Sequence, residues 1–214
     1  MKRWLAEALG TALITVTVVG SAFMAANLTE DKALQLLINA LTTAMVLLVA
    51  IFLLTPVSGA HFNPVVTIIF LVTKKIKGNE AVSYIAAQVL GGALGTILAN
   101  LMFTSKAVVL SEINRASANN YLGELIATTI LILIILLSIE QGRGSAIPYL
   151  VPAWIGSAYF STVSTSFANP AVTLARFLSA NGTGINLSSA SAFIAVQLIG
   201  GFFALALARV LANK

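Results

Sequence analysis

The sequence predicts an all-α membrane protein in which six transmembrane helices and two re-entrant half-helices form an inverted repeat. Three observations predict this class: the composition, the number of long apolar segments, and a duplicated pattern that contains two Asn-Pro pairs. Of the 214 residues, 58% are hydrophobic and 9% are charged, whereas soluble domains carry about 25% charged residues. This composition excludes an ordinary cytosolic enzyme, a disordered chain and a nucleic-acid-binding protein.

The numbers of cysteine and histidine residues limit the kinds of metal site and cross-link that the chain can form. The chain has no cysteine and a single histidine, which excludes disulfides, thiolate metal sites and a histidine-rich metal site. We find no nucleophile paired with a base and no phosphate-binding glycine loop. The sequence therefore predicts no enzymatic activity, no cofactor and no metal.

Six apolar segments are long enough to cross a bilayer, whose core takes about 20 residues of helix. They lie at roughly 4–26, 34–55, 81–103, 119–139, 146–166 and 188–211. The first is too long for a signal peptide and lacks a convincing cleavage site, so we interpret it as a retained span. With the N-terminus inside, inner segments hold eight Lys and Arg residues and outer segments hold four, which predicts that both termini are cytoplasmic.

Two further apolar stretches, at about 63–73 and 169–178, are too short to span, and each begins with Asn-Pro. Backbone that enters a membrane without crossing it must be buried in protein or line a wet cavity. Asn is a preferred N-cap and Pro a preferred first helical residue. Asn63-Pro64 and Asn169-Pro170 therefore predict two helix starts beside a cavity at membrane depth.

The two halves of the chain resemble each other, which predicts an internal repeat. Residues 4–14 align with 121–131, placing Glu7 over Glu124; 59–70 align with 166–177; and 86–99 align with 195–208. Each half has three spans, so the halves run in opposite directions. We predict a single channel domain over residues 1–214, with inverted repeats at about 1–105 and 117–214 and the site at their interface. Each Asn amide would then point its NH₂ group at whatever fills the cavity.

The paired motifs SGAHFNPVVT and FANPAVT, together with AEALGT and GELIAT, resemble those of the aquaporins, the major intrinsic proteins. The resemblance covers essentially the whole chain. It implies a homotetramer in a lipid bilayer with one pore per subunit. It also implies pore motifs at Asn63, Pro64, Val65, Asn169, Pro170 and Ala171. Carbonyls ahead of the motifs would line the pore, at Gly59, Ala60, His61, Thr165, Ser166 and Phe167.

Glu7 and Glu124 match buried glutamates that brace the re-entrant loops in this family, although a proton-coupling role stays open. His61 matches a position beside the pore, where it is either a plain hydrogen-bonding group or a pH gate. Deep carboxylates are functional-site hypotheses in any membrane protein.

The resemblance has two departures. The first motif reads Asn-Pro-Val, and the arginine that usually follows the second Asn-Pro-Ala is replaced by Val172. By the family's spacing the outer constriction would comprise Thr43, Ser157, Ser166 and Val172. All four are small or medium-sized, which predicts a wide, arginine-free filter with weaker proton exclusion. Arg176 lies four residues on and about 6 Å further out. It either reaches back to replace the missing charge or, as we expect, snorkels to the outer mouth.

The function that this resemblance implies is a passive channel for water and small neutral solutes. Glycerol, urea-sized solutes and neutral trivalent or methylated arsenic hydroxides are the expected cargo, since the motif pattern is similar to bacterial channels associated with arsenic resistance. A bacterial inner (plasma) membrane is the expected location. Two alternatives stay open: a water-selective pore in which Arg176 restores selectivity, and an ion-coupled secondary transporter that uses Glu7 and Glu124.

Overall fold

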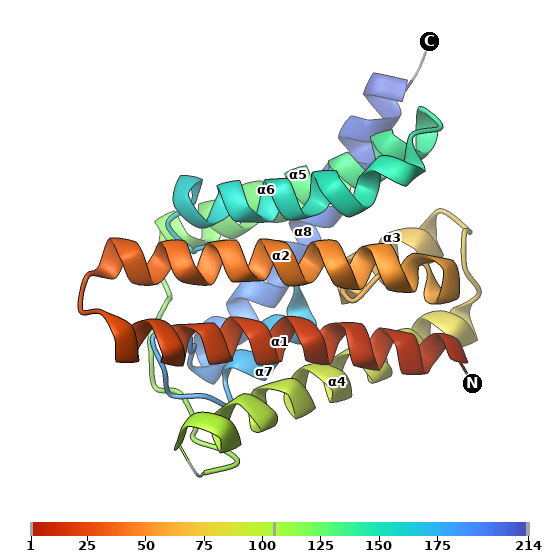
Figure 1. Cartoon of the computed structure of the whole chain (residues 1–214). Coiled ribbons are helices and arrows are strands. Elements are labelled where there is room, and N and C mark those ends of the chain that lie inside the picture. The colour runs from red at the N-terminus through yellow and green to blue at the C-terminus, as the bar shows by residue number, and fades with distance from the viewer. Residues whose placement is uncertain (1, 105, 213–214) are drawn as a thin grey trace.

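The structure, a computed structural model, describes residues 2–104 and 106–212, so Met1, Ser105, Asn213 and Lys214 lie outside it. The regular elements of the described residues are all helical (Figure 1). In chain order they are α1 (Lys2–Leu28), α2 (Lys32–Ser58), α3 (Pro64–Val72), α4 (Gly78–Thr104), α5 (Ala118–Glu140), the 3₁₀ turn η1 (Gly144–Ala146), α6 (Ile147–Ser161), α7 (Pro170–Arg176) and α8 (Leu187–Ala212).

Five of the six predicted spans are helices long and apolar enough to cross a membrane: α1, α2, α4, α5 and α8. The sixth, α6, has 15 residues, so it rises only about 22 Å. Our prediction of a helix over 146–166 ended too late. The chain leaves the helix at Ser161, and Thr165 and Ser166 have φ of 62° and 52°, which a right-handed helix cannot accommodate.

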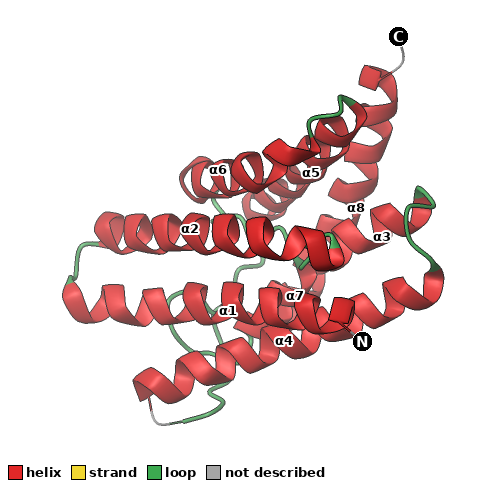
Figure 2. Ribbon diagram, turned by 45° about the vertical axis from the view of Figure 1, so that its right-hand side comes forward, coloured by secondary structure: helices red, strands yellow, loops and turns green. Residues whose placement is uncertain are grey.

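The helices form one bundle in which equivalent elements make equivalent contacts (Figures 1 and 2). In the first half, α1 packs against α4 and α2; in the second half, α5 packs against α8 and α6 in the equivalent way. The two halves are joined where α2 packs against α6. Each short helix contacts long helices of both halves, α3 through α4 and α8, and α7 through α8 and α4. Both termini lie at the same end of the bundle, together with the connections at 73–77 and 141–146 (Figure 1).

Glycines bring α1 and α4 into backbone contact. A Cβ atom added at Gly91 would overlap the backbone of Ala8, and one at Gly95 would overlap the carbonyl of Ala12. Because the two helices lie so close together, Thr15 Oγ1 of α1 can donate a hydrogen bond to the carbonyl of Gly92 in α4 at 2.9 Å. Small residues of this kind permit close helix packing in membranes, and here they hold α1 where Glu7 can reach the loop before α3.

Candidate functional site

Helices α3 and α7 begin beside each other in the middle of the bundle. Asn63 caps α3, its Oδ1 accepting from the Val65 N–H at 2.9 Å. Asn169 caps α7, its Oδ1 accepting from the Ala171 N–H at 3.0 Å and the Val172 N–H at 3.3 Å. A proline follows each asparagine, at a position where the missing N–H would have no helical partner anyway. Both half-helices therefore start where the Asn-Pro pairs predict.

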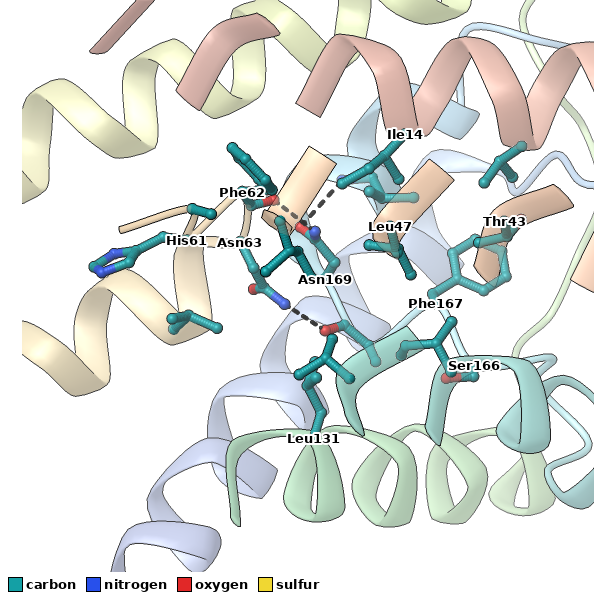
Figure 3. A pocket seen from close by; sticks show the side chains of 18 of the residues that line it. Ile14, Thr43, Leu47, His61, Phe62, Asn63, Leu131, Ser166, Phe167 and Asn169 are labelled. Carbon is teal, nitrogen blue, oxygen red and sulfur yellow. Dashed lines mark hydrogen bonds between the residues drawn. The ribbon is translucent and has the colours of Figure 1, made fainter. Parts of the chain in front are cut away.

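The two asparagines are also cross-linked by hydrogen bonds (Figure 3). Asn63 Nδ2 donates to the Ala168 carbonyl at 2.7 Å, and Asn169 Nδ2 donates to the Phe62 carbonyl at 2.8 Å. An amide nitrogen carries two hydrogens, so one N–H of each asparagine stays without a protein acceptor among the described residues. Both side chains line the main cavity. Our expectation that the whole NH₂ group faces the cavity was half right, because one hydrogen fixes the other loop.

The segments before the caps, which we call the pore loops (59–63 and 165–169), have an unusual backbone. Ala60 and Phe62 have φ of 51° and 50°, and Ser166 and Ala168, at the same distances from their asparagine, have φ of 52° and 46°. Non-glycine residues adopt this region at a cost of about 1–3 kcal/mol each, so the surroundings must impose it.

Glu7 of α1 imposes the first loop's conformation. Its Oε1 accepts from Ser58 Oγ at 2.6 Å and from the His61 N–H at 3.0 Å. Its Oε2 accepts from the Phe62 N–H at 2.6 Å and from Gln88 Nε2 at 2.8 Å. Glu7 is fully buried. These are the contacts that loop bracing requires, and they occupy both carboxylate oxygens.

Glu124 of α5 holds the second loop in the same way. Its Oε1 accepts from the Phe167 N–H at 2.9 Å, and its Oε2 accepts from the Ala168 N–H at 2.8 Å and from Gln197 Nε2 at 2.6 Å. Three of the four hydrogen bonds that Glu7 accepts thus have a counterpart at Glu124, namely those from two loop N–H groups and from a glutamine. The fourth is the bond from a serine hydroxyl.

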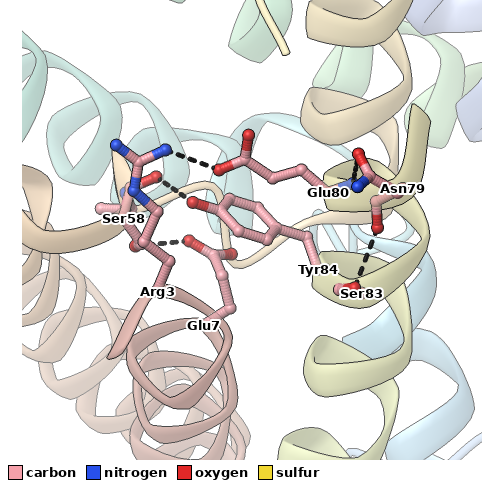
Figure 4. Close-up of polar contacts among 8 residues, drawn as sticks. Arg3, Glu7, Ser58, Asn79, Glu80, Ser83 and Tyr84 are labelled. Atoms are coloured by element: carbon pink, nitrogen blue, oxygen red, sulfur yellow. Dashed lines mark hydrogen bonds and ion pairs between the residues drawn. The ribbon is translucent and has the colours of Figure 1, made fainter. Parts of the chain in front are cut away.

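Beyond Glu7, a polar chain leads to the end of the bundle that carries the termini (Figure 4). Tyr84 of α4 donates its hydroxyl to the Ser58 carbonyl at 2.8 Å. Near it, Arg3 and Glu80 pair at 2.8 Å on the surface. These contacts tie α1 and α4 to the start of the first pore loop.

A cavity runs past both asparagines, with His61 towards one end and Thr43, Ser166 and Phe167 towards the other (Figure 3). We call these the His61 end and the Arg176 end. Much of the wall between them is aliphatic, and it includes Ile14, Val18, Leu47, Ile51, Leu131 and Ile135. The free asparagine N–H groups are therefore isolated donors in an apolar tube.

Three of the four residues predicted for the constriction line this cavity: Thr43, Ser166 and Val172. The prediction for Ser157 was wrong. Ser157 lies on the exposed face of α6, whereas Val151, Ile155 and Tyr159 of that helix face the cavity. The Tyr159 hydroxyl lies 3.1 Å from Thr43 Oγ1, within hydrogen-bonding distance.

Arg176 is also not where we expected it. It does not snorkel outward but is 2% exposed and lines the same cavity as Thr43 and Tyr159. Its Nε donates to the Thr183 carbonyl at 2.6 Å, and its guanidinium carbon lies 3.4 Å from the centroid of the Phe167 ring. These two contacts draw the side chain inward, so an arginine lines the cavity near the predicted filter and the expected position at the outer mouth was wrong. Weaker proton exclusion stays a prediction.

The remaining predicted residues divide into two groups. Ala60, His61 and Phe167 line the cavity with the asparagines. The others lie outside the set of cavity-lining residues: Gly59, Thr165, Pro64, Val65, Pro170 and Ala171. Val65 instead packs against α8, where a Cβ at Gly201 would overlap its Cγ1.

Sequence reasoning missed Tyr159, Thr183 and Arg115 at the Arg176 end. Tyr159 could have been found from α6 alone, because it follows Val151, Pro152 and Ile155 at helical spacing on the buried face. Thr183 and Arg115 act through loop contacts, for which the sequence carries no periodic signal.

The family model that describes the major intrinsic proteins matches residues 1–166. The chain belongs to the major intrinsic protein family. The match covers the first repeat and about half of the second, and it ends just before the motif in which Val172 replaces the usual arginine.

Individual relatives agree with this assignment. The chain is 42% identical over 208 residues to "Aquaglyceroporin AqpS" of Rhizobium meliloti (strain 1021), covering 97% of this chain and 89% of that protein. It is 37% identical over 103 residues to "Aquaporin NIP3-1" of Arabidopsis thaliana, covering 48% of this chain and 31% of that protein. The structure of the aquaglyceroporin from Plasmodium falciparum superposes with a TM-score of 0.68 at 22% identity, covering 99% and 95% of the two chains, and so shares the fold.

As a major intrinsic protein, the chain is an integral membrane channel for water and small neutral solutes such as glycerol, and it is not an enzyme. The carboxylates that an ion-coupled transporter would need are Glu7 and Glu124. Both are fully buried and bind backbone N–H groups. The geometry therefore leaves neither of these two carboxylates free to change partners.

Proposed function

We propose that this major intrinsic protein is a passive aquaglyceroporin-type pore that conducts water, glycerol and urea-sized neutral solutes. The observation that carries the proposal is the cross-linked asparagine pair, in which each asparagine keeps one N–H donor available to a passage whose wall is largely aliphatic. A neutral hydroxyl or carbonyl oxygen is stabilised there, whereas a cation meets two positive helix ends.

Further details of the proposal rest on the family and on the sequence. The functional unit is one domain over residues 1–214, with inverted repeats at about 1–105 and 117–214, and four copies assemble in the bilayer. Both termini are cytoplasmic in a bacterial plasma membrane. Neutral trivalent and methylated arsenic hydroxides, which resemble polyols, belong to the cargo. Arsenite uptake by proteoliposomes, mass photometry of the purified protein and terminal reporter fusions test these points separately.

The decisive experiment is stopped-flow light scattering on proteoliposomes under sucrose, glycerol and urea gradients. We expect water efflux and then re-swelling as glycerol and urea enter, with flux linear in gradient and indifferent to protonophores. Arg143→Gln, in the exposed turn after α5, serves as a matched control and should behave as wild type. Saturable, proton-dependent flux, or no flux above empty vesicles, would contradict the proposal.

A water-selective pore is the second candidate, and the buried position of Arg176 favours it. In that case the same vesicles shrink in a glycerol gradient and do not re-swell.

A further inference from the structure

The Arg176 end of the cavity holds two guanidinium groups around one aromatic ring. The guanidinium carbon of Arg176 lies 3.4 Å from the Phe167 ring centroid, and that of Arg115 lies 5.2 Å from it. The face of an aromatic ring attracts cations. Phe167 is itself fixed, because Glu124 accepts its backbone N–H at 2.9 Å. Its ring also packs edge-on against Phe193 at 5.3 Å.

The backbone carbonyls of three consecutive residues, Gly182 to Gly184, accept hydrogen bonds from these two arginines. The outer two bind Arg115 and the middle one binds Arg176. Arg115 Nη2 donates to the Gly182 carbonyl at 2.9 Å, Arg176 Nε to the Thr183 carbonyl at 2.6 Å, and Arg115 Nε to the Gly184 carbonyl at 2.7 Å. Arg115 comes from the segment that joins the two halves, so it grips the loop on both sides of the carbonyl that orients Arg176.

This carbonyl triplet has little freedom to shift. Asn181 Nδ2, just before it, donates to the Val19 carbonyl of α1 at 3.0 Å. A Cβ at Gly184 would lie 2.8 Å from Ser111 Cβ, so the loop fits closely against the segment that carries Arg115. The position of the Arg176 guanidinium is therefore set by contacts outside α7.

Neither Arg115 nor Arg176 forms an ion pair with another described residue. Within the described part of the chain, the one salt bridge joins Arg3 to Glu80, far along the sequence from this cluster. The buried carboxylate that binds the backbone of Phe167 is Glu124, and its oxygens accept from Phe167, Ala168 and Gln197. The terminal nitrogens of Arg176 have no protein acceptor among the described residues, and the side chain lines the cavity.

We propose that Arg176 is the specificity-determining residue of this pore, and that Arg115 is its positioning residue. The inference rests on the proposed channel function and deepens it. Arg176 presents N–H donors and a permanent positive charge to the passage beside the Thr43 and Tyr159 hydroxyls. It selects neutral solutes with acceptor oxygens and rejects cations, including the hydrated proton. It does so from one helical turn beyond Val172, held by the Thr183 carbonyl and by the Phe167 ring.

The test compares wild type with Arg176→Gln in proteoliposomes that contain a pH-sensitive dye. Water flux by light scattering is measured on the same vesicles, so that proton leak is expressed per conducting channel. We expect the normalised leak to rise about tenfold, because a unit charge beside the passage repels a passing cation by at least this factor in a partly polar medium. Failure of the proposed function looks different, since wild type then conducts no water.

Three further variants keep the inference open to refutation. Arg176→Lys retains the charge and should leak less than twofold above wild type. Arg115→Gln should leak between wild type and Arg176→Gln, because the loop carbonyls lose two donors and Arg176 becomes misplaced. If Arg176→Gln does not assemble, Phe167→Leu decides instead, and increased leak with retained water flux is expected. The inference is overturned if Arg176→Gln conducts water and its proton leak equals that of wild type. If Arg176→Gln does not assemble, the same result in Phe167→Leu overturns it.

Discussion

The two pore loops carry different side chains at the same two positions. Two residues before its asparagine, the first loop has His61 and the second has Phe167. Seven residues after it, the first half-helix has Phe70 and the second has Arg176. In both halves these two side chains are in contact. The His61 and Phe70 rings meet edge-on with centroids 4.5 Å apart, and the guanidinium carbon of Arg176 lies 3.4 Å from the Phe167 ring centroid.

A third group completes each cluster at the same place. Tyr84 packs edge-on against His61 and Phe193 packs edge-on against Phe167, in both cases with ring centroids 5.3 Å apart. Each lies four residues before the glutamine that reaches the bracing glutamate. The aromatic frame is therefore similar at both ends, and the buried charge differs. One end has the buried Arg176 guanidinium, whereas the other has a histidine among aromatic rings, with the exposed Lys75 ammonium 5.5 Å from the Phe70 centroid.

The largest effect should come from breaking the shared frame. Glu7→Gln and Glu124→Gln each place an amide NH₂ against buried backbone N–H donors, and we expect each to lower the free energy of unfolding by about 2–5 kcal/mol. Thermal unfolding in detergent measures the loss. Because the two networks match, both variants should be damaged to a similar degree; a wild-type unfolding midpoint in either one contradicts the shared frame.

The next effect concerns the size of the passage at the Arg176 end. Val172→Arg puts a second guanidinium into a wall that Val172 already lines, so glycerol permeability should fall at least tenfold while water flux persists. Val172→Leu is the control for bulk without charge or donors. If both variants conduct glycerol as wild type does, Val172 does not belong to the constriction.

A smaller effect is expected at the His61 end. His61→Phe reproduces the residue that the second loop carries at this position, and Glu7 still accepts the backbone N–H. The proton leak per unit water flux should change by less than twofold. A change as large as that of Arg176→Gln would mean that both ends exclude cations and that the comparison between them fails.

The smallest effect concerns packing behind the pore. Val65→Ala leaves a space of two methyl groups against α8 and should cost about 1–2 kcal/mol without changing flux. Gly201→Ala alone should destabilise the channel, because its Cβ overlaps Val65. Together the two changes should cost less than their sum. Strict additivity in thermal unfolding would show that the two sites are not in contact.

Much of this architecture could be predicted because local signals repeat. Asn-Pro marks a helix start without help from the rest of the chain, and its second occurrence predicts where the two starts meet. The matched positions of Glu7 and Glu124 likewise predict two equivalent networks. Helix α6 was the exception among the spans, because its end depends on the left-handed residues of the following loop.

The residues at the Arg176 end could not be placed in the same way. Which face of α6 meets the cavity depends on the backbone between Ser161 and Asn169, so counting back from the motif selected Ser157 instead of Tyr159. The direction of Arg176 is decided by the Phe167 ring and by the Thr183 carbonyl. The position of the Thr183 carbonyl depends in turn on Arg115, which lies 61 residues before Arg176 in the sequence. No helical period reports such contacts.

The most direct test of the central claim moves the guanidinium by one helical turn. The double variant Arg176→Gln with Val172→Arg is compared with Arg176→Gln alone in the proton-leak assay, normalised to water flux. We predict that Arg176→Gln alone leaks about tenfold more than wild type and that the double variant returns to within about twofold of wild type. If Arg176→Gln conducts water and is as proton-tight as wild type, Arg176 is not the cation that sets the selectivity of this pore.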